Sequence, residues 1–206
     1  GGLITLKVYF DSGTTNSRVY LIKDCKIIDH ATKSIGSKDS SVAGSNRVLL
    51  EGLKQLYDIV LERNGLKDKD ISNIYASGMV TSPFGIKEVP HLKVPVGIED
   101  LRSHIYNYFE DMLFKRQIGL IPGVKSTPDS GAITSDNILK VNSMRGEEVE
   151  IFGLLSSLDH NVKSLGTVFL IPGSHTQMAY VRNQKITDLV STISGELFYA
   201  ISNHTI

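Results

Sequence analysis

Short apolar segments rich in β-branched and aromatic residues open the chain. Leu3 to Phe10, Ser17 to Lys23 and Lys26 to His30 each have the composition of a strand, and Lys23-Asp24-Cys25 supplies a turn. The tip between the first two segments, Asp11-Ser12-Gly13, is polar and contains a glycine. The pattern predicts a three-stranded meander.

A polar loop and an amphipathic helix are expected next. Residues 34–45 are mostly polar and are predicted to form the loop. Apolar residues then recur at helical spacing until Asn64-Gly65, which is a typical helix end. The apolar face of this helix comprises Leu49, Leu53, Leu56, Tyr57, Val60 and Leu61.

Strands and helices alternate through the rest of the chain. The predicted elements are a strand at 71–76 that runs into Ser77-Gly78-Met79, an edge strand or extended segment at 89–96, a helix at 98–115, a strand at 118–121, a polar stretch at 125–137, a helix from about 144 to 158, strands at 167–171, 177–182 and 185–190, and a helix at 195–202. A meander followed by a helix thus occurs twice, as a weak internal repeat. The alternation indicates the α/β class.

Composition narrows the classes of partner. The 206 residues carry 22 Lys and Arg against 22 Asp and Glu, and this balance argues against a nucleic acid or an anionic membrane as the main partner. The single Cys25 excludes a disulfide framework within the chain, and no apolar run is long enough to span a membrane as a helix. We therefore expect a cytoplasmic protein that acts on small molecules.

The first hairpin tip, Asp11 to Arg18, carries the clearest chemistry. Gly13 permits a tight turn, and the hydroxyls of Thr14 and Thr15 with nearby backbone N–H groups could surround phosphate oxygens while Asp11 holds a hydrated Mg²⁺. An ordinary turn is the competing interpretation, because Asp, Ser, Gly, Thr and Asn all favour turns. Neither a Walker loop nor a Gly-x-Gly-x-x-Gly fingerprint is present.

Two further segments are candidates for a site. Arg145-Gly146-Glu147-Glu148 opens a predicted helix, where carboxylates often just complement the helix dipole, but one of them could accept the proton of an attacking hydroxyl. Pro172-Gly173-Ser174-His175-Thr176 forms a second polar hairpin tip and suits phosphate better than a serine hydrolase triad, since no Gly-x-Ser-x-Gly elbow is present. The remaining histidines, His91 among them, show no metal-binding spacing and are expected to be structural or exposed.

Taken in order, these segments resemble the 2-dehydro-3-deoxygalactonokinase family of sugar-acid kinases, within the actin-like ATPase superfamily. The matching blocks are Asp11 to Arg18, Ser77 to Ser82, Ile121-Pro122-Gly123, Met144 to Glu148, Ile171 to Thr176 and Ser194 to Phe198. The resemblance implies a ribonuclease H-like α/β lobe with a mixed sheet at residues 1–160. It further implies the start of a second, similar and incomplete lobe at 161–206.

The resemblance also implies transfer of the ATP γ-phosphate to the terminal hydroxyl of 2-dehydro-3-deoxy-D-galactonate, with Mg²⁺. It places Asp11 at the metal, and the phosphates at Ser12, Gly13, Thr14, Thr15, Asn16, Arg18, Gly173, Ser174 and His175. It places the sugar acid at Gly78, Met79 and Ser82, and the transfer point near Arg145, Glu147 and Glu148. Glu147 is expected to be the base, with Glu148 as the alternative.

The chain departs from the family pattern at two points. Thr176-Gln177-Met178 lacks the cation that the family usually has there, and the family's chains continue beyond Ile206. We therefore expect very low activity from these residues alone, and exposed apolar surface of an incomplete lobe would favour a homo-oligomer. Two other functions remain open, an exopolyphosphatase-like phosphohydrolase and a non-catalytic module that binds a sugar acid or a nucleotide.

Overall fold

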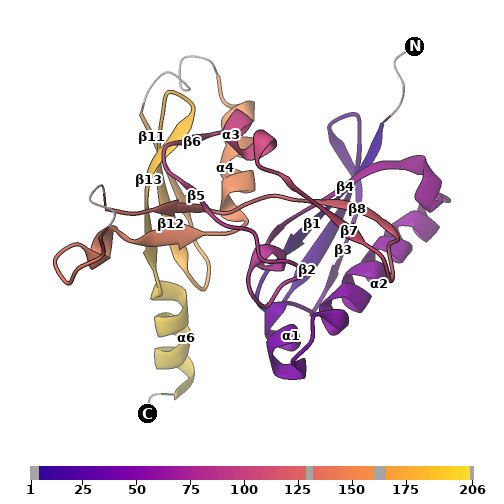
Figure 1. Cartoon of the computed structure of the whole chain (residues 1–206), viewed down its shortest axis with the longest axis horizontal. Helices are drawn as coiled ribbons and strands as arrows, with labels where there is room; N and C mark the ends of the chain where they lie inside the picture. The colour runs from indigo at the N-terminus through magenta and orange to yellow at the C-terminus, as the bar shows by residue number, and fades with distance from the viewer. Residues whose placement is uncertain (1–4, 129–131, 160–165, 205–206) are drawn as a thin grey trace. The chain divides into compact units, whose positions relative to one another are not determined.

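The computed structural model describes residues 5–128, 132–159 and 166–204, which form two compact units (Figure 1). One unit comprises Gly1–Pro90 and His104–Pro122, and the other His91–Ser103 and Gly123–Ile206. The predicted lobe boundary between residues 160 and 161 lies outside the described residues and stays a prediction. Within the described residues, no helix is both long and apolar enough to cross a membrane.

A six-stranded mixed sheet forms the centre of the first unit. Its strand order is β3-β2-β1-β4-β8-β7. β1 to β3 form an antiparallel meander, β1, β4 and β8 run parallel to one another, and β7 is antiparallel to β8. The strands are β1 (Leu6–Ser12), β2 (Ser17–Lys23), β3 (Lys26–Lys33), β4 (Ile71–Gly78), β7 (Tyr106–Glu110) and β8 (Arg116–Leu120). The predicted meander and the mixed sheet are confirmed.

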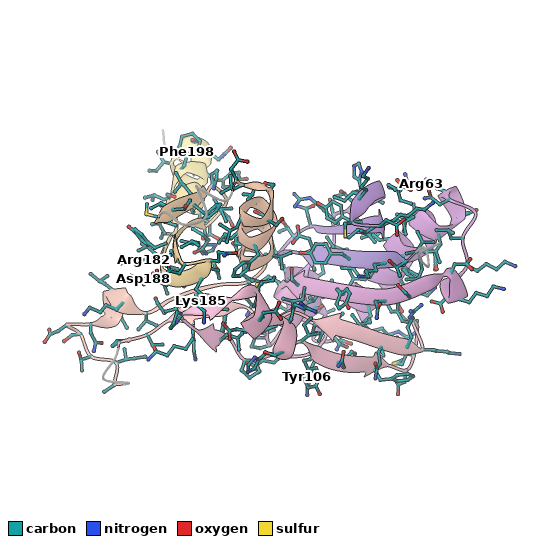
Figure 2. All side chains as sticks on the ribbon, turned by 90° about the horizontal axis from the view of Figure 1, so that it is seen from above. Arg63, Tyr106, Arg182, Lys185, Asp188 and Phe198 are labelled. Carbon is teal, nitrogen blue, oxygen red and sulfur yellow. The ribbon has the colours of Figure 1, made fainter. Side chains whose placement is uncertain are left out.

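Helix α2 (Arg47–Arg63) packs against β2 and β3 and supplies much of the apolar core of this unit. Its predicted apolar face is buried, and Asn64 caps its end as expected. Arg63, at that end of the helix (Figure 2), donates to Asp29 Oδ1 at 3.0 Å and so joins the helix to β3.

The loop predicted at residues 34–45 is wrong in part, because it contains helix α1 (Ser37–Ala43). Asp39 Oδ2 accepts a hydrogen bond from the Gly36 N–H at 2.8 Å, which caps the first turn. Gly44, at φ +64°, ends the helix in the left-handed conformation. These end signals are present in the sequence, but the polar residues between them hide the helix.

The helix predicted at residues 98–115 is confirmed only up to Ser103 and is wrong beyond it. Helix α3 (Ile98–Ser103) is short, and the chain then forms the hairpin of β7 and β8. The buried carboxylate of Glu110 fixes the hairpin turn by accepting hydrogen bonds from the N–H groups of Met112, Leu113 and Phe114 at 2.6 to 3.0 Å. Aromatic residues favour strands, and here this preference and the turn outweigh the helical spacing of apolar residues.

The second unit contains two small sheets, with orders β11-β12-β13-β6 and β10-β9-β5. The predicted helices at 144–158 and 195–202 are confirmed as α4 and α6, and the extended segment at 89–96 contains β5 and the start of β6. Phe198 of α6 is 73% exposed (Figure 2). The elements are β5 (Leu92–Lys93), β6 (Val96–Gly97), β9 (Val124–Ser126), β10 (Asn142–Met144), α4 (Glu147–Ser157), β11 (Thr167–Ile171), β12 (Thr176–Arg182), β13 (Lys185–Thr192) and α6 (Ser194–His204).

The internal repeat is confirmed in the strand register. Ser17 faces Lys33 across β2 and β3, and Thr176 faces Thr192 across β12 and β13, so one constant shift in residue number relates the two pairs. An irregularity in the pairing lies between Leu21 and Ile22 in one meander and between Tyr180 and Val181 in the other. The same offset in residue number relates these two positions. The following turns, Asp24-Cys25 and Asn183-Gln184, both have positive φ angles.

Candidate active site

The first candidate segment is the tip of the β1–β2 hairpin. The Gly13 N–H donates to the Asn16 carbonyl at 2.8 Å, which closes the turn and leaves Thr14, Thr15 and Asn16 exposed. Arg18 faces Asp11 across the strands and donates to Asp11 Oδ2 at 3.0 Å. The tip therefore combines one carboxylate, one guanidinium and exposed hydroxyls.

Buried hydroxyls support this tip from below. Ser12 and Ser17 are fully buried, and their Oγ atoms lie 2.8 Å apart. Ser17 Oγ also donates to the Ile35 carbonyl at 2.8 Å, which ties the hairpin to the chain just before α1. The Ser12 side chain thus stabilises the hairpin, so a contact of Ser12 with phosphate would have to use its backbone.

The β4 segment lies directly beside the hairpin. Gly78 pairs with Ser12, and a Cβ atom at Gly78, whose φ is +86°, would lie 2.4 Å from the Ser12 carbonyl oxygen. Only glycine fits there. Met79 is half-buried, whereas Ser82 is 3% exposed and its Oγ donates to the Met79 carbonyl at 2.7 Å. The predicted substrate-binding group of Gly78, Met79 and Ser82 therefore follows the strand end next to the tip, with the Ser82 hydroxyl engaged locally.

Helix α1 begins in contact with the hairpin tip. The Ser37 N–H donates to the Gly13 carbonyl and the Lys38 N–H to the Thr14 carbonyl, at 3.2 and 2.9 Å. A Cβ atom at Gly36 would lie 2.3 Å from the Thr14 carbonyl oxygen. The absence of a side chain at Gly36 is therefore what lets the helix start approach the tip.

The second unit repeats this contact at the β11–β12 hairpin. A Cβ atom at Gly195, at the start of α6, would meet the Gly173 carbonyl oxygen. The Glu196 N–H donates to the Ser174 carbonyl at 3.0 Å, and Glu196 Oε1 lies 3.9 Å from His175 Nδ1. Both predicted phosphate turns are thus hairpin tips joined to a helix start through a glycine.

The two tips differ in charge. Where Asp11 faces Arg18 in the first hairpin, Ile171 faces Gln177 in the second. Of these two hairpins, only the first therefore has a carboxylate suited to Mg²⁺. Among the described residues, no group of three or more His, Cys, Asp and Glu side chains could hold a metal ion.

The Glu147-Glu148 pair lies at the start of α4, and its two members have different surroundings. Glu148 is fully buried and both of its carboxylate oxygens accept from the Gly146 N–H at 2.9 Å. Burial raises the pKa of Glu148 to about 8, although the hydrogen bonds and Arg145 act in the opposite direction. Glu147 is half-buried and begins the helix after Gly146, whose φ is +108°.

His91 joins this cluster, and the sequence offered no spacing signal for it. Its Nδ1 atom lies 3.3 Å from Arg145 Nη2. Burial, followed by the positive charges of Arg145 and Lys125, lowers the pKa of His91 to about 4, so the ring is neutral at pH 7 and accepts from the guanidinium. A Cβ atom at Gly123 would lie within 2.8 Å of both side chains. Gly123 thus permits this packing.

The strand order of the six-stranded sheet, with α2 packed against β2 and β3, is that of a ribonuclease H-like fold of the actin-like ATPase class. Its structure is similar to that of a Sinorhizobium meliloti protein that carries the name 2-dehydro-3-deoxygalactonokinase, with a TM-score of 0.73, 19% identity, and coverage of 97% of this chain and 58% of that one. A Ppx/GppA phosphatase of Aquifex aeolicus gives a TM-score of 0.53 at 13% identity, over 98% of this chain and 57% of the other.

The family is narrower than the fold class. The model of the 2-keto-3-deoxy-galactonokinase family matches residues 11–206, and the chain belongs to that family. The 2-dehydro-3-deoxygalactonokinase of Escherichia coli (strain K12) is 26% identical over 199 residues, which are 97% of this chain. The chain spans 57% of the length of that relative.

Proposed function

We propose that the protein of which this chain is a part is a sugar-acid kinase that transfers the γ-phosphate of ATP to the terminal hydroxyl of 2-dehydro-3-deoxy-D-galactonate. The observation that carries the proposal is the family match over residues 11–206, which includes every candidate site residue. A cytoplasmic location is proposed on the same basis.

The first hairpin is proposed to hold Mg²⁺ and the ATP phosphates. Mg²⁺ in kinases is usually bound by one or two carboxylates together with phosphate oxygens and water, so the single carboxylate of Asp11 beside the hydroxyls of Thr14 and Thr15 fits the ion. When bound, Mg²⁺ would neutralise charge on the phosphates. Arg18 orients Asp11 through the ion pair at 3.0 Å. Gly13, Asn16 and the backbone of Ser12 complete this first phosphate turn.

The second hairpin is proposed to bind phosphate through backbone N–H groups at Gly173 and Ser174 and through the imidazole of His175. Without a cation at Gln177 or Met178, this turn relies on dipoles and on His175.

The start of α4 is proposed to serve the transfer step. Glu147 accepts the proton of the terminal hydroxyl while the hydroxyl oxygen attacks the γ-phosphorus. The bond between the γ-phosphorus and the β–γ bridging oxygen breaks, which releases ADP. Arg145 stabilises the negative charge of the transferring group. The complete burial of Glu148 and its bonds to Gly146 support Glu147 as the base and Glu148 as the residue that shapes the helix start.

Product analysis of the full-length protein tests this function. With ATP, Mg²⁺ and 2-dehydro-3-deoxy-D-galactonate, ³¹P NMR should show ADP and a phosphomonoester at the terminal carbon, in equal amounts. Release of inorganic phosphate from ATP or polyphosphate without the sugar acid would instead indicate a phosphohydrolase. Binding of the sugar acid without any product would indicate a non-catalytic module.

A further inference from the structure

A pocket of about 550 Å³, lined by polar and apolar residues alike, lies in the first unit, apart from the candidate site residues described above. One wall comes from the end of α1 and the link to α2, with Ser40, Ser41, Ser45 and Asn46. The other wall is the loop from Pro83 to Glu88, which follows the predicted substrate-binding group.

Hydrogen bonds hold both walls in place. Asn46 Nδ2 donates to the Ile86 carbonyl at 3.1 Å and so connects one wall with the other. The Ile86 N–H donates to the Val80 carbonyl at 2.8 Å, and the Gly85 N–H to the Ser82 carbonyl at 2.9 Å. The loop is therefore pinned to the segment after β4, and the pocket does not require a ligand for its shape.

A buried hydroxyl at this pocket is left unsatisfied. Ser40 is 4% exposed, and its Oγ atom has no hydrogen-bond partner in the described part of the chain. A buried hydroxyl without a partner costs about 1 to 3 kcal/mol. A buried polar atom without a partner calls for an explanation, such as an ordered water or a bound ion.

The charges of the lining indicate the class of ligand. Lys87 and Glu88 lie side by side in the loop, and the other wall is lined by serines and Asn46. Lys87 suits one carboxylate, while Glu88 and the serines suit several hydroxyls. A nucleotide triphosphate would need more cations than this pocket has, because its one lysine is balanced by one glutamate. The lining thus matches a small polyhydroxy acid.

The pocket is connected to the first hairpin tip by two short segments. Helix α1 starts at the tip with Ser37 and Lys38 and spans about 10 Å to its end at the pocket. The segment Met79–Thr81 leads from Gly78, beside Ser12, to the Pro83–Glu88 loop. An acceptor in the pocket is therefore one short helix away from the proposed phosphate turn.

We propose that this pocket binds the acceptor of the kinase reaction, with Lys87 on the carboxylate and Ser45 and Glu88 around the hydroxyls. The assignment rests on the proposed function for the identity of the acid, and it adds residues beyond Gly78, Met79 and Ser82 to the acceptor site.

Steady-state kinetics of the full-length protein test the role of Lys87. Lys87→Met should raise KM for the sugar acid about 10- to 100-fold, with KM for ATP unchanged, and Lys87→Arg should restore most of the affinity. Lys69→Met is the matched control, because Lys69 is an exposed lysine before the start of β4, at the other end of that strand. An unchanged KM in Lys87→Met, in an active enzyme, would overturn the pocket assignment and leave the proposed function intact.

A binding measurement separates the two proposals further. This chain contains no tryptophan, so Phe84→Trp places a fluorescent reporter at the pocket, where Phe84 is 56% exposed. The sugar acid alone should change its emission, and Lys87→Met should weaken that response. A response to ATP but not to the sugar acid would contradict an acceptor site. A response to the sugar acid in a protein without kinase activity would support the pocket and contradict the proposed function.

Discussion

Glu148 occupies an uncommon place for a glutamate, since it is fully buried and its partners are the backbone N–H groups of Gly146 and of Glu148 itself. Its pKa of about 8 in the folded protein lies well above the ordinary value of 4.5. The folded state therefore binds a proton that the unfolded state has already released, and stability must fall as the pH rises through this interval. The pKa of His91 in the folded protein is about 4, below its ordinary value of 6.5. His91 therefore makes the stability rise with pH between these two values.

Between pH 6.5 and 8, the Glu148 effect should dominate over that of His91. We expect the free energy of unfolding to fall by roughly 1 to 2 kcal/mol over this range, because each pKa unit corresponds to about 1.4 kcal/mol. Glu148→Gln should remove the decline, whereas Glu150→Gln, an exposed position on the same helix, should retain it. Urea denaturation at several pH values measures the slopes, and equal slopes in the wild type and Glu148→Gln would contradict the burial argument.

His91 should act as a positioning residue through Arg145. Loss of the Nδ1 acceptor in His91→Ala should lower kcat/KM about 10-fold, because the guanidinium is no longer held, and His91→Gln should recover part of it through its amide oxygen. Since the His91 ring is neutral at pH 7, the loss of activity in His91→Ala should be the same at pH 6 and at pH 7. Kinetics of the full-length protein check this, with exposed His104→Ala as the control. Wild-type kcat/KM in His91→Ala would exclude the role.

The sequence indicates some site residues and conceals others for a physical reason. Asp11, Arg145 and the glutamate pair stand in recognisable local motifs. His91 lies 54 residues from Arg145, and the contact arises only when Gly123 lets the two segments approach. Motif reading detects residues that are adjacent in the chain, and this pair is adjacent only in space.

At the scale of elements, both proposed phosphate turns depend on a helix start packed against a hairpin tip. At each contact a carbonyl of the tip lies too close for a side chain, and the position is a glycine, Gly36 or Gly195. The start of α1 is therefore held by its contact with the hairpin tip. This contact explains why residues 37–43 form a helix although their polar sequence looks like a loop.

Gly36→Ala should separate α1 from the first hairpin tip. The added methyl group would lie 2.3 Å from the Thr14 carbonyl oxygen, so the backbone has to move, and we expect a loss of about 1 to 3 kcal/mol in the free energy of unfolding. Gly153→Ala is the control, because a Cβ atom there meets nothing within 4 Å and alanine favours the helix. Denaturant titration gives both values. Equal stability of Gly36→Ala and the wild type would contradict the close contact.

The errors in predicting elements also have a common cause. The segment 98–115 has apolar residues at helical spacing, yet the buried Glu110 turn directs it into a β-hairpin. By contrast, β2, β3 and α2 were predicted closely, since each has a strong local pattern and a turn or cap at its end. The spacing of apolar residues fails here because the buried carboxylate of Glu110 and its hydrogen bonds to the following turn decide the conformation.

At the scale of the whole molecule, the chain contains two related meanders with different chemistry. The first ends in an ion pair of Asp11 and Arg18, and the second has Ile171 and Gln177 at the corresponding register. The repeat could be seen in the sequence as an order of elements, and the structure adds the matching register and the paired glycines. The asymmetry supports the proposal that the first hairpin holds the metal ion.

The most direct test of the account is the rate of phosphoryl transfer from ATP to 2-dehydro-3-deoxy-D-galactonate by the full-length protein, in the wild type and in Asp11→Asn. Removal of one electrostatic group of this kind typically lowers kcat about 10²- to 10³-fold, and we expect such a loss. Asp29→Asn, on β3 of the same sheet, should keep its activity because Asp29 bonds to Arg63, away from the hairpin tip. Transfer at the wild-type rate by Asp11→Asn would contradict the central claim.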